Sequence, residues 1–213
     1  MGRPGASPWL SQLPVLRSVM PNAYAPLRDF IRPAWAARDL WRVILMILLF
    51  EFVFNLSPSI FALLLPTDAL RDAFFEGTTA FGTLAQFASF GIATGGLVVL
   101  LKLLHQRGFW SLIGPADRAF VDMFRVAILV GFWLLVIELA PPWIDRSELA
   151  EVRNVGIWLA LIPMTLVVLL IQVGTEELFF RGYLQQQLAC LSESRLAWMI
   201  FPSLMFGGLH YWN

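Results

Sequence analysis

The sequence VGIWLALIPMTLVVLLIQVGTEELFFRGYLQQQ, residues 155–187, joins a long apolar run to a cluster of charged side chains. The run Val155–Val173 is close to the roughly 20 residues that an α-helix needs to cross a bilayer. Glu176 and Glu177 follow it side by side, and Arg181 comes one helical turn later. Because an ionisable side chain costs roughly 2.5–3.5 kcal/mol at the bilayer centre, a function is the first hypothesis for this cluster.

The composition of the whole chain agrees with a membrane location. Of the 213 residues, 58% are hydrophobic, and the mean hydropathy is +0.70, whereas soluble domains are about 45–50% apolar. The formal net charge is zero, so nothing indicates a nucleic-acid partner. Cys190 is the single cysteine, and an internal disulfide is therefore excluded. We predict an integral membrane protein.

The apolar segments predict an all-α fold, a polytopic bundle of about five transmembrane helices. The five predicted spans are Leu40–Leu65, Gly77–Leu104, Val126–Ala140, Val155–Val173 and Leu196–Trp212. Residues 1–38 contain six prolines, which prevent a continuous helix, and are expected to form an irregular cytosolic arm. Residues 39–213 are expected to form the membrane domain, with loops at 66–76 and 102–125.

Most Lys and Arg residues fall on one side of this predicted topology, in the arm, the 102–125 loop and the 181–195 stretch. The positive-inside rule then places the N-terminus and the Glu-Glu end of the fourth span in the cytosol. The expected location is a bacterial inner membrane.

The positions of several polar and small residues predict their surroundings in the folded protein. Glu51 and Asn55 are four apart, so they share a helix face. That face is expected to point into the protein, for packing, hydrogen bonding or a contribution to a site. His105, at a membrane edge, is expected to be solvated. Gly91 and Gly95 form a small-xxx-small pair, which lets a neighbouring helix approach closely.

The charged cluster has a spacing that suits acid–base chemistry. Glu177 and Arg181 are four apart on a helix and can pair. Glu176 and Arg181 are five apart and diverge by about 140° on a regular α-helix. Glu176 is thus left free, and a glutamate in a poorly hydrated site is a competent general base.

A second candidate group lies in the last predicted span, which reads FGGLHYWN over residues 206–213. His210 stands among apolar residues, where a histidine is unusual. Gly207 and Gly208 permit the close approach of another helix. With the Glu-Glu-Arg cluster upstream, a functional role for His210 is a better interpretation than packing alone.

Glu176-Glu177-xxx-Arg181 followed by Phe206-xxx-His210 resembles the first two motifs of the CPBP family of intramembrane proteases, which includes CAAX prenyl proteases and bacterial Abi proteins. The resemblance implies peptide-bond hydrolysis within or beside the membrane. It implies that Glu176 is the general base, that His210 co-positions the water, that Glu177 and Arg181 support them, and that Phe206 shapes the site.

The resemblance also bears on cofactors and partners. No cofactor is expected, and the chain has no His-Glu-x-x-His motif. A divalent metal held by Glu176, Glu177 and His210 stays an open alternative. The partners that the resemblance implies are a peptide or membrane-protein substrate and the lipid bilayer.

The sequence departs from the family in one respect. The family has a third motif on a later helix, a histidine followed four residues on by asparagine or aspartate, which is assigned to the oxyanion hole. No such motif follows before Asn213. Since one oxyanion donor is worth about 10²–10³ in rate, we expect an N-terminal portion of a protease with little or no activity of its own.

Two other functions compete with the protease. One is a non-catalytic scaffold or immunity-type membrane protein of the same fold. The other is an ion-coupled carrier that uses Glu51 and Glu176 as relay sites. A carrier predicts broken helices in repeated halves, and the sequence shows no such repeat.

Overall fold

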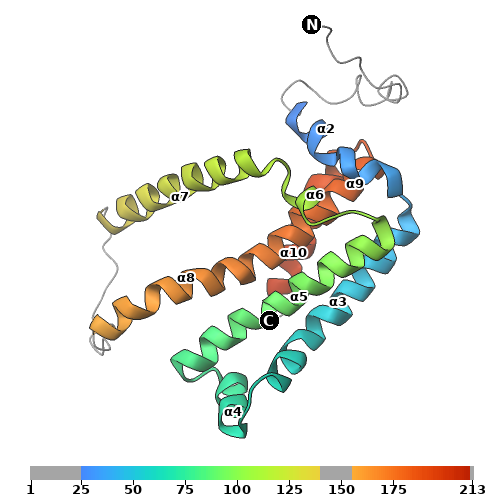
Figure 1. Cartoon of the computed structure of the whole chain (residues 1–213). Helices are drawn as coiled ribbons and strands as arrows, with labels where there is room; N and C mark the ends of the chain where they lie inside the picture. Colours follow the sequence, from blue (N-terminus) through green and yellow to red (C-terminus); the bar gives the residue numbers. More distant parts are fainter. Residues whose placement is uncertain (1–24, 140–154, 212–213) are drawn as a thin grey trace, which may run out of the picture. The chain divides into compact units, whose positions relative to one another are not determined.

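The computed structural model describes residues 25–139 and 155–211, which are almost entirely helical and contain no strand (Figure 1). The predicted all-α class is confirmed. The chain forms two compact units. The first comprises Met1–Phe52, Gly96–Leu112 and Glu176–Asn213, and the second comprises Val53–Gly95 and Ile113–Thr175.

Four helical stretches in the described part are long and apolar enough to cross a membrane. They are Leu40–Leu63 in α3, Ala80–His105, which is α5, Arg118–Leu139 in α7 (Ala116–Leu139), and Gly156–Leu191, which begins in α8 (Val155–Glu177). The fifth predicted span is helical over Leu196–Tyr211 in segments of 5 and 11 residues. These segments together are shorter than the roughly 20 residues that a span needs, and Trp212 lies outside the described residues.

In the second unit, the predicted loop at 66–76 is instead a helix, α4 (Asp68–Glu76). The Thr67 hydroxyl caps its N-terminus by accepting from the Leu70 N–H at 3.3 Å, and Gly77 ends it in the left-handed conformation at φ +64°. Both caps follow the usual residue preferences. The helix packs through a small core, Ala62, Leu65, Phe74 and Ala85.

Contacts between α5 and α8 in the second unit end just before the Glu-Glu pair. Thr175 is fully buried, and its hydroxyl lies 2.6 Å from that of Thr94 and 3.2 Å from the Phe90 carbonyl. A Cβ on Gly91 would lie 3.7 Å from Ile171 Cγ2, whereas Gly95 has nothing within 4 Å among the described residues. The contact at Gly91 is an ordinary van der Waals distance, so the close approach predicted for the glycine pair is not present among the described residues.

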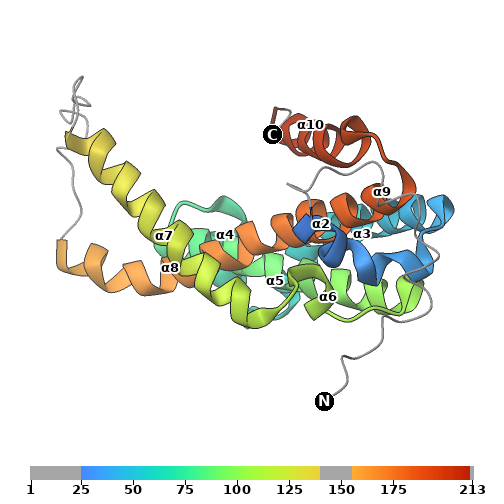
Figure 2. The same ribbon diagram turned by 90° about the horizontal axis from the view of Figure 1, so that it is seen from above.

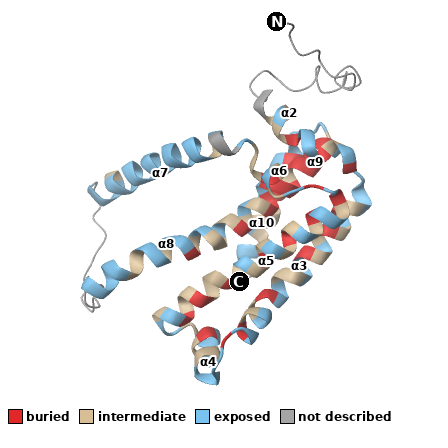
Figure 3. Cartoon of the chain, viewed as in Figure 1, coloured by how far each residue is buried: buried red, intermediate tan, exposed pale blue. Residues whose placement is uncertain are grey.

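Helix α7, also in the second unit, is exposed along nearly all of its length (Figure 3). It begins at Ala116, well before the predicted start at Val126, and its first turns carry an ion pair between Arg125 and Asp122 at 2.9 Å. Its apolar surface suits contact with lipid, because its backbone polar groups are satisfied within the helix.

Helix α3 does not turn its polar residues inward. Glu51 and Asn55 are both exposed, so the prediction that their face points into the protein is wrong. In the first unit the inward face of α3 consists of Val43, Met46 and Phe50. The Phe50 ring stacks on Phe179 at 4.1 Å between centroids, and this apolar contact sets the rotation of the helix.

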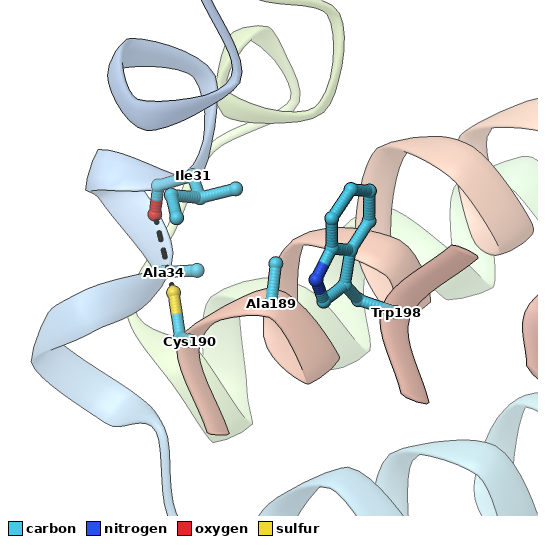
Figure 4. Close-up of a cluster of buried hydrophobic side chains, with 5 residues drawn as sticks. All are labelled: Ile31, Ala34, Ala189, Cys190 and Trp198. Atoms are coloured by element: carbon cyan, nitrogen blue, oxygen red, sulfur yellow. Dashed lines mark hydrogen bonds between the residues drawn. The ribbon is translucent and has the colours of Figure 1, made fainter. Parts of the chain in front are cut away.

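Part of the predicted irregular arm is helical. In the first unit, α2 (Ala25–Ile31) and the 3-10 helix η3 (Arg32–Ala37) pack against α9 (Gln185–Leu191), as Figures 1 and 2 show. Pro33 falls in the first turn of η3, where its missing N–H costs nothing. The core of this contact is Ile31, Ala34, Ala189, Cys190 and Trp198 (Figure 4).

Candidate active site

The first motif lies where regular α-helix gives way to a wider helix. Helix α8 ends at Glu177, and Leu178–Leu184 forms a π-helix, η5, before α9 begins. π-helical turns are rare and are frequent at functional sites. The predicted regular helix over the motif is thus interrupted immediately after the two glutamates.

The predicted pairing within the motif is present but loose. Arg181 Nε lies 3.8 Å from Glu177 Oε2, and both side chains are about half exposed, at 46% and 52%. Such pairs add little to stability. Glu176 is partly buried and makes no hydrogen bond or ion pair with the described residues. Its carboxylate can therefore accept a proton or a hydrogen bond from a substrate or a water.

The second motif is carried by α10 (Phe201–Tyr211), which follows a second π-helix, η6 (Leu196–Ile200). The Phe206 ring packs edge-on against Phe180 at 5.3 Å and lies 4.3 Å from the His210 ring. Phe206 thereby joins the helix of the second motif to the helix of the first.

His210 is exposed, and its Nδ1 lies 2.9 Å from the Phe206 carbonyl oxygen. Because a carbonyl oxygen only accepts, this bond assigns the proton to Nδ1. In the neutral ring, Nε2 is then an acceptor, able to hold a water by one of its O–H groups.

Several contacts that the sequence suggested between the two motifs are missing from the structure. Among residues 25–139 and 155–211, no hydrogen bond or ion pair joins Glu176 to His210. Gly207 and Gly208 have nothing within 4 Å in this part of the chain, so the close helix approach expected there is absent. No group of three or more His, Cys, Asp or Glu residues that could hold a metal forms among the described residues.

A buried polar network beside the motif escaped prediction. His105 is only 3% exposed, which contradicts the expectation that it is solvated. Its Nδ1 lies 3.0 Å from the Ala37 carbonyl oxygen, and its Nε2 lies 2.9 Å from the Tyr183 hydroxyl. The residues that bury His105 lie far away in the sequence. Its place at the end of a predicted span therefore did not reveal that it is buried.

Arg107 forms a second group of buried polar contacts, with the start of α9. It is 6% exposed and donates through Nη2 to the carbonyl of Ser111, at 3.2 Å, and to Gln186 Oε1. Gln186 Nε2 in turn donates to the Ser111 carbonyl at 2.9 Å. Burial lowers the pKa of the Arg107 guanidinium to about 10, so it stays charged at neutral pH. The run of three glutamines after Leu184 was the available signal, since polar side chains inside an apolar helix need partners.

Gly182, one residue after Arg181, has a steric role. A Cβ at this position would lie 2.9 Å from the carbonyl oxygen of Leu112 and 3.1 Å from its Cβ. Leu112 belongs to the short helix α6 (Trp110–Ile113). The backbone of η5 thus approaches α6 at a distance that only glycine permits without a shift.

Comparisons with known proteins find a family resemblance in the same part of the chain. Residues 158–213, which contain both motifs, match the family model described as Type II CAAX prenyl endopeptidase Rce1-like. The chain is also 23% identical over 197 residues to a protein of Bacillus subtilis (strain 168) named "Uncharacterized protein YyaK". This match covers 88% of the chain and 66% of the relative, so the chain spans slightly less than two thirds of that protein's length.

No solved structure matches the chain. The chain is accordingly an integral membrane protein of all-α fold whose residues 158–213 are similar to CAAX prenyl proteases.

Proposed function

We propose that this protein, in the longest form that its gene encodes, is an intramembrane endopeptidase of the CAAX-protease (CPBP) type, in which Glu176 activates a water to hydrolyse a peptide bond. The observation that carries the proposal is the packing of Phe206 on Phe180. It holds the helix bearing His210 against the helix that continues from Glu176. The family match over residues 158–213 supports the same reaction class.

In this mechanism the Glu176 carboxylate takes a proton from the water as the oxygen attacks the scissile carbonyl. The tetrahedral intermediate then collapses, and Glu176 returns the proton to the leaving amine. General base catalysis of this kind is worth about 10²–10⁴ in rate. Nε2 of His210 accepts a hydrogen bond from the same water and orients it. Phe206 keeps the two helices in position, and Glu177 and Arg181 pair next to Glu176.

The reaction needs no metal in this proposal. The proton transfers described above are complete without one. Activity of the purified protein should survive treatment with a strong chelator. Loss of activity that returns with added zinc would contradict the glutamate mechanism.

The substrate is a peptide or a membrane-protein segment that reaches Glu176 from the bilayer or from its surface. We place the protein in the bacterial inner membrane with its N-terminus in the cytosol, because the Lys and Arg distribution follows the positive-inside rule. The lipid bilayer is the second partner, and no nucleic acid is involved.

One observation favours a second candidate, a non-catalytic scaffold or immunity-type protein of the same fold. His210 Nδ1 bonds to the carbonyl of its own helix, and no direct bond to Glu176 forms among the described residues. A protein that keeps the packing of the two motifs without turnover would have this arrangement.

The two candidates differ in what happens when Glu176 changes to Gln. Membranes from cells that express either the wild type or E176Q at equal levels are compared by mass spectrometry of new protein N-termini. E193Q is the matched control, because Glu193 is an exposed glutamate further along the same region. The protease predicts N-termini that depend on the wild type and on E193Q and vanish with E176Q. Identical N-termini in all three would favour the scaffold.

A further inference from the structure

The segment that precedes α3 has two distinct faces. We call residues 25–39 the strap. Its inner face, Ile31 and Ala34, is fully buried against α9 and η6. Its three arginines are Arg32 and Arg38, which are exposed, and Arg28, which is half-buried. The strap is therefore fixed to the protein on one side and presents guanidinium groups on the other.

The ends of two spans adjoin the strap, and they place it at a membrane surface. Arg38 and Asp39 immediately precede the span that begins at Leu40, and two residues reach no more than about 7 Å. The Ala37 carbonyl bonds to Nδ1 of His105, the last residue of the α5 span. The strap thus runs where one span begins and another ends, at the depth of the lipid headgroups.

Arginine and tryptophan side chains alternate at this level. The guanidinium carbon of Arg38 lies 4.6 Å from the centre of the Trp35 ring, and that of Arg42 lies 5.3 Å from the Trp41 ring. Tryptophan favours the membrane interface. An arginine stacked on a tryptophan through a cation–π contact keeps its N–H groups available at the ring edge.

The charge on the outer side is positive. Asp39 is paired with Arg42 at 3.1 Å, which leaves Asp29 as the acidic side chain on the strap beside Arg28, Arg32 and Arg38. Arginine matches phosphate oxygens with two parallel hydrogen bonds. Basic clusters next to a span are attracted to anionic lipids by about 1 kcal/mol per residue, which is roughly fivefold in affinity.

We propose that the outer face of the strap binds the phosphate groups of anionic phospholipids. The partner is a lipid and not a free phosphate, because the strap adjoins the span at headgroup depth, and Trp35 and the neighbouring Trp41 fit the interface. The binding is independent of Glu176 and His210. Since the inner face packs on α9, bound lipid also stabilises the folded first unit by mass action.

The test uses the full chain, purified in detergent and titrated with phosphatidylglycerol or phosphatidylcholine while bound lipid is counted by native mass spectrometry. We expect phosphatidylglycerol to bind at least tenfold more tightly than phosphatidylcholine. The variant R28Q/R32Q/R38Q should lose at least tenfold in affinity for phosphatidylglycerol. The charge-matched variant R28K/R32K/R38K should keep most of it. If the triple glutamine variant fails to fold, R32Q and R38Q alone should each lose roughly fivefold.

Equal binding of the two lipids, or unchanged binding by the glutamine variants, would overturn the proposal. Competition by inorganic phosphate shows whether the site binds a lipid or a free phosphate ion. If it competes with phosphatidylglycerol at equal concentration, the site is a phosphate site and the lipid proposal is wrong. If it competes only at far higher concentration, the lipid is the ligand.

Discussion

The Tyr183 hydroxyl lies 2.9 Å from Nε2 of His105, and this bond ties the π-helix of the first motif to the last residue of α5. Nδ1 of the same imidazole faces the Ala37 carbonyl. The same Nδ1 also lies 3.2 Å from Gln187 Nε2 in α9. One histidine thus connects three segments that are far apart in the sequence, and the motif helix depends on it for its position.

Replacing Tyr183 with Phe keeps the ring and removes the hydroxyl. His105 Nε2 is then left buried without its hydroxyl partner, which costs about 1–3 kcal/mol. We expect a lower free energy of unfolding for Y183F in detergent micelles, with unchanged helical circular dichroism. Y211F is the control, because Tyr211 is 82% exposed and surface changes are usually within about 0.5 kcal/mol. Equal loss in the two variants would contradict the network's role.

Replacing Gly182 with Ala tests the approach of η5 to α6. The new Cβ would lie 2.9 Å from a backbone carbonyl oxygen, which cannot rotate away. Overpacking of this kind costs about 1–3 kcal/mol. G95A is the matched control, since nothing described lies within 4 Å of its Cβ, and helix propensity favours alanine by about 1 kcal/mol. Thermal unfolding should rank G182A below the wild type and G95A at or above it.

Much of the fold was predictable because hydrophobicity determines where helices cross a bilayer. The first predicted span, Leu40–Leu65, differs from α3 by two residues at its end. The start of α7 was missed because its polar first turns, which include Asp122 and Arg125, do not look like a span. These turns are helical all the same, and Arg125 pairs with Asp122 one turn earlier within them. A run of apolar residues indicates only the part of a helix that lies in the membrane, so polar turns beyond the membrane are missed.

The hydroxyl pair Thr94–Thr175 joins α5 to α8 immediately before Glu176. Single changes T94V and T175V and the double change form a cycle that isolates their interaction. Side-chain hydrogen bonds within membrane proteins average about 0.6 kcal/mol and reach about 1.7 kcal/mol. We expect a coupling in that range, measured by unfolding in mixed micelles. A coupling indistinguishable from zero would mean that the 2.6 Å contact does not stabilise the helix pair.

Phe206 should matter for activity more than for stability. Its ring is only partly buried, yet it connects Phe180 to His210. F206A should lower kcat/KM by at least tenfold through displacement of His210, while F206W, which keeps an aromatic ring, should retain more activity. Steady-state cleavage assays and unfolding curves on the same samples separate the two effects. Activity losses that simply follow stability would contradict a role in positioning.

The candidate site was only partly accessible to sequence reasoning. The pairing of Glu177 with Arg181 follows from their spacing and is present. The π-helix from Leu178 was not foreseeable, because it accompanies a tertiary contact, that of Gly182 with Leu112. His105 was misjudged for the same reason, since its partners Ala37 and Tyr183 are 68 and 78 residues away. The spacing of residues in the sequence predicts contacts within one helix. Burial depends on contacts between segments that are far apart in the sequence.

The central claim is that Glu176 and His210 act on one water molecule, and a double-mutant cycle on cleavage rate tests it most directly. Cleavage of one identified substrate is measured for wild type, E176Q, H210A and the double variant at equal folded concentrations. Groups that act as a unit are strongly non-additive. We predict that the double variant is no slower than the slower single variant, with E176Q slower than wild type by at least about 10². Full activity in E176Q, or losses that multiply in the double variant, would contradict the account.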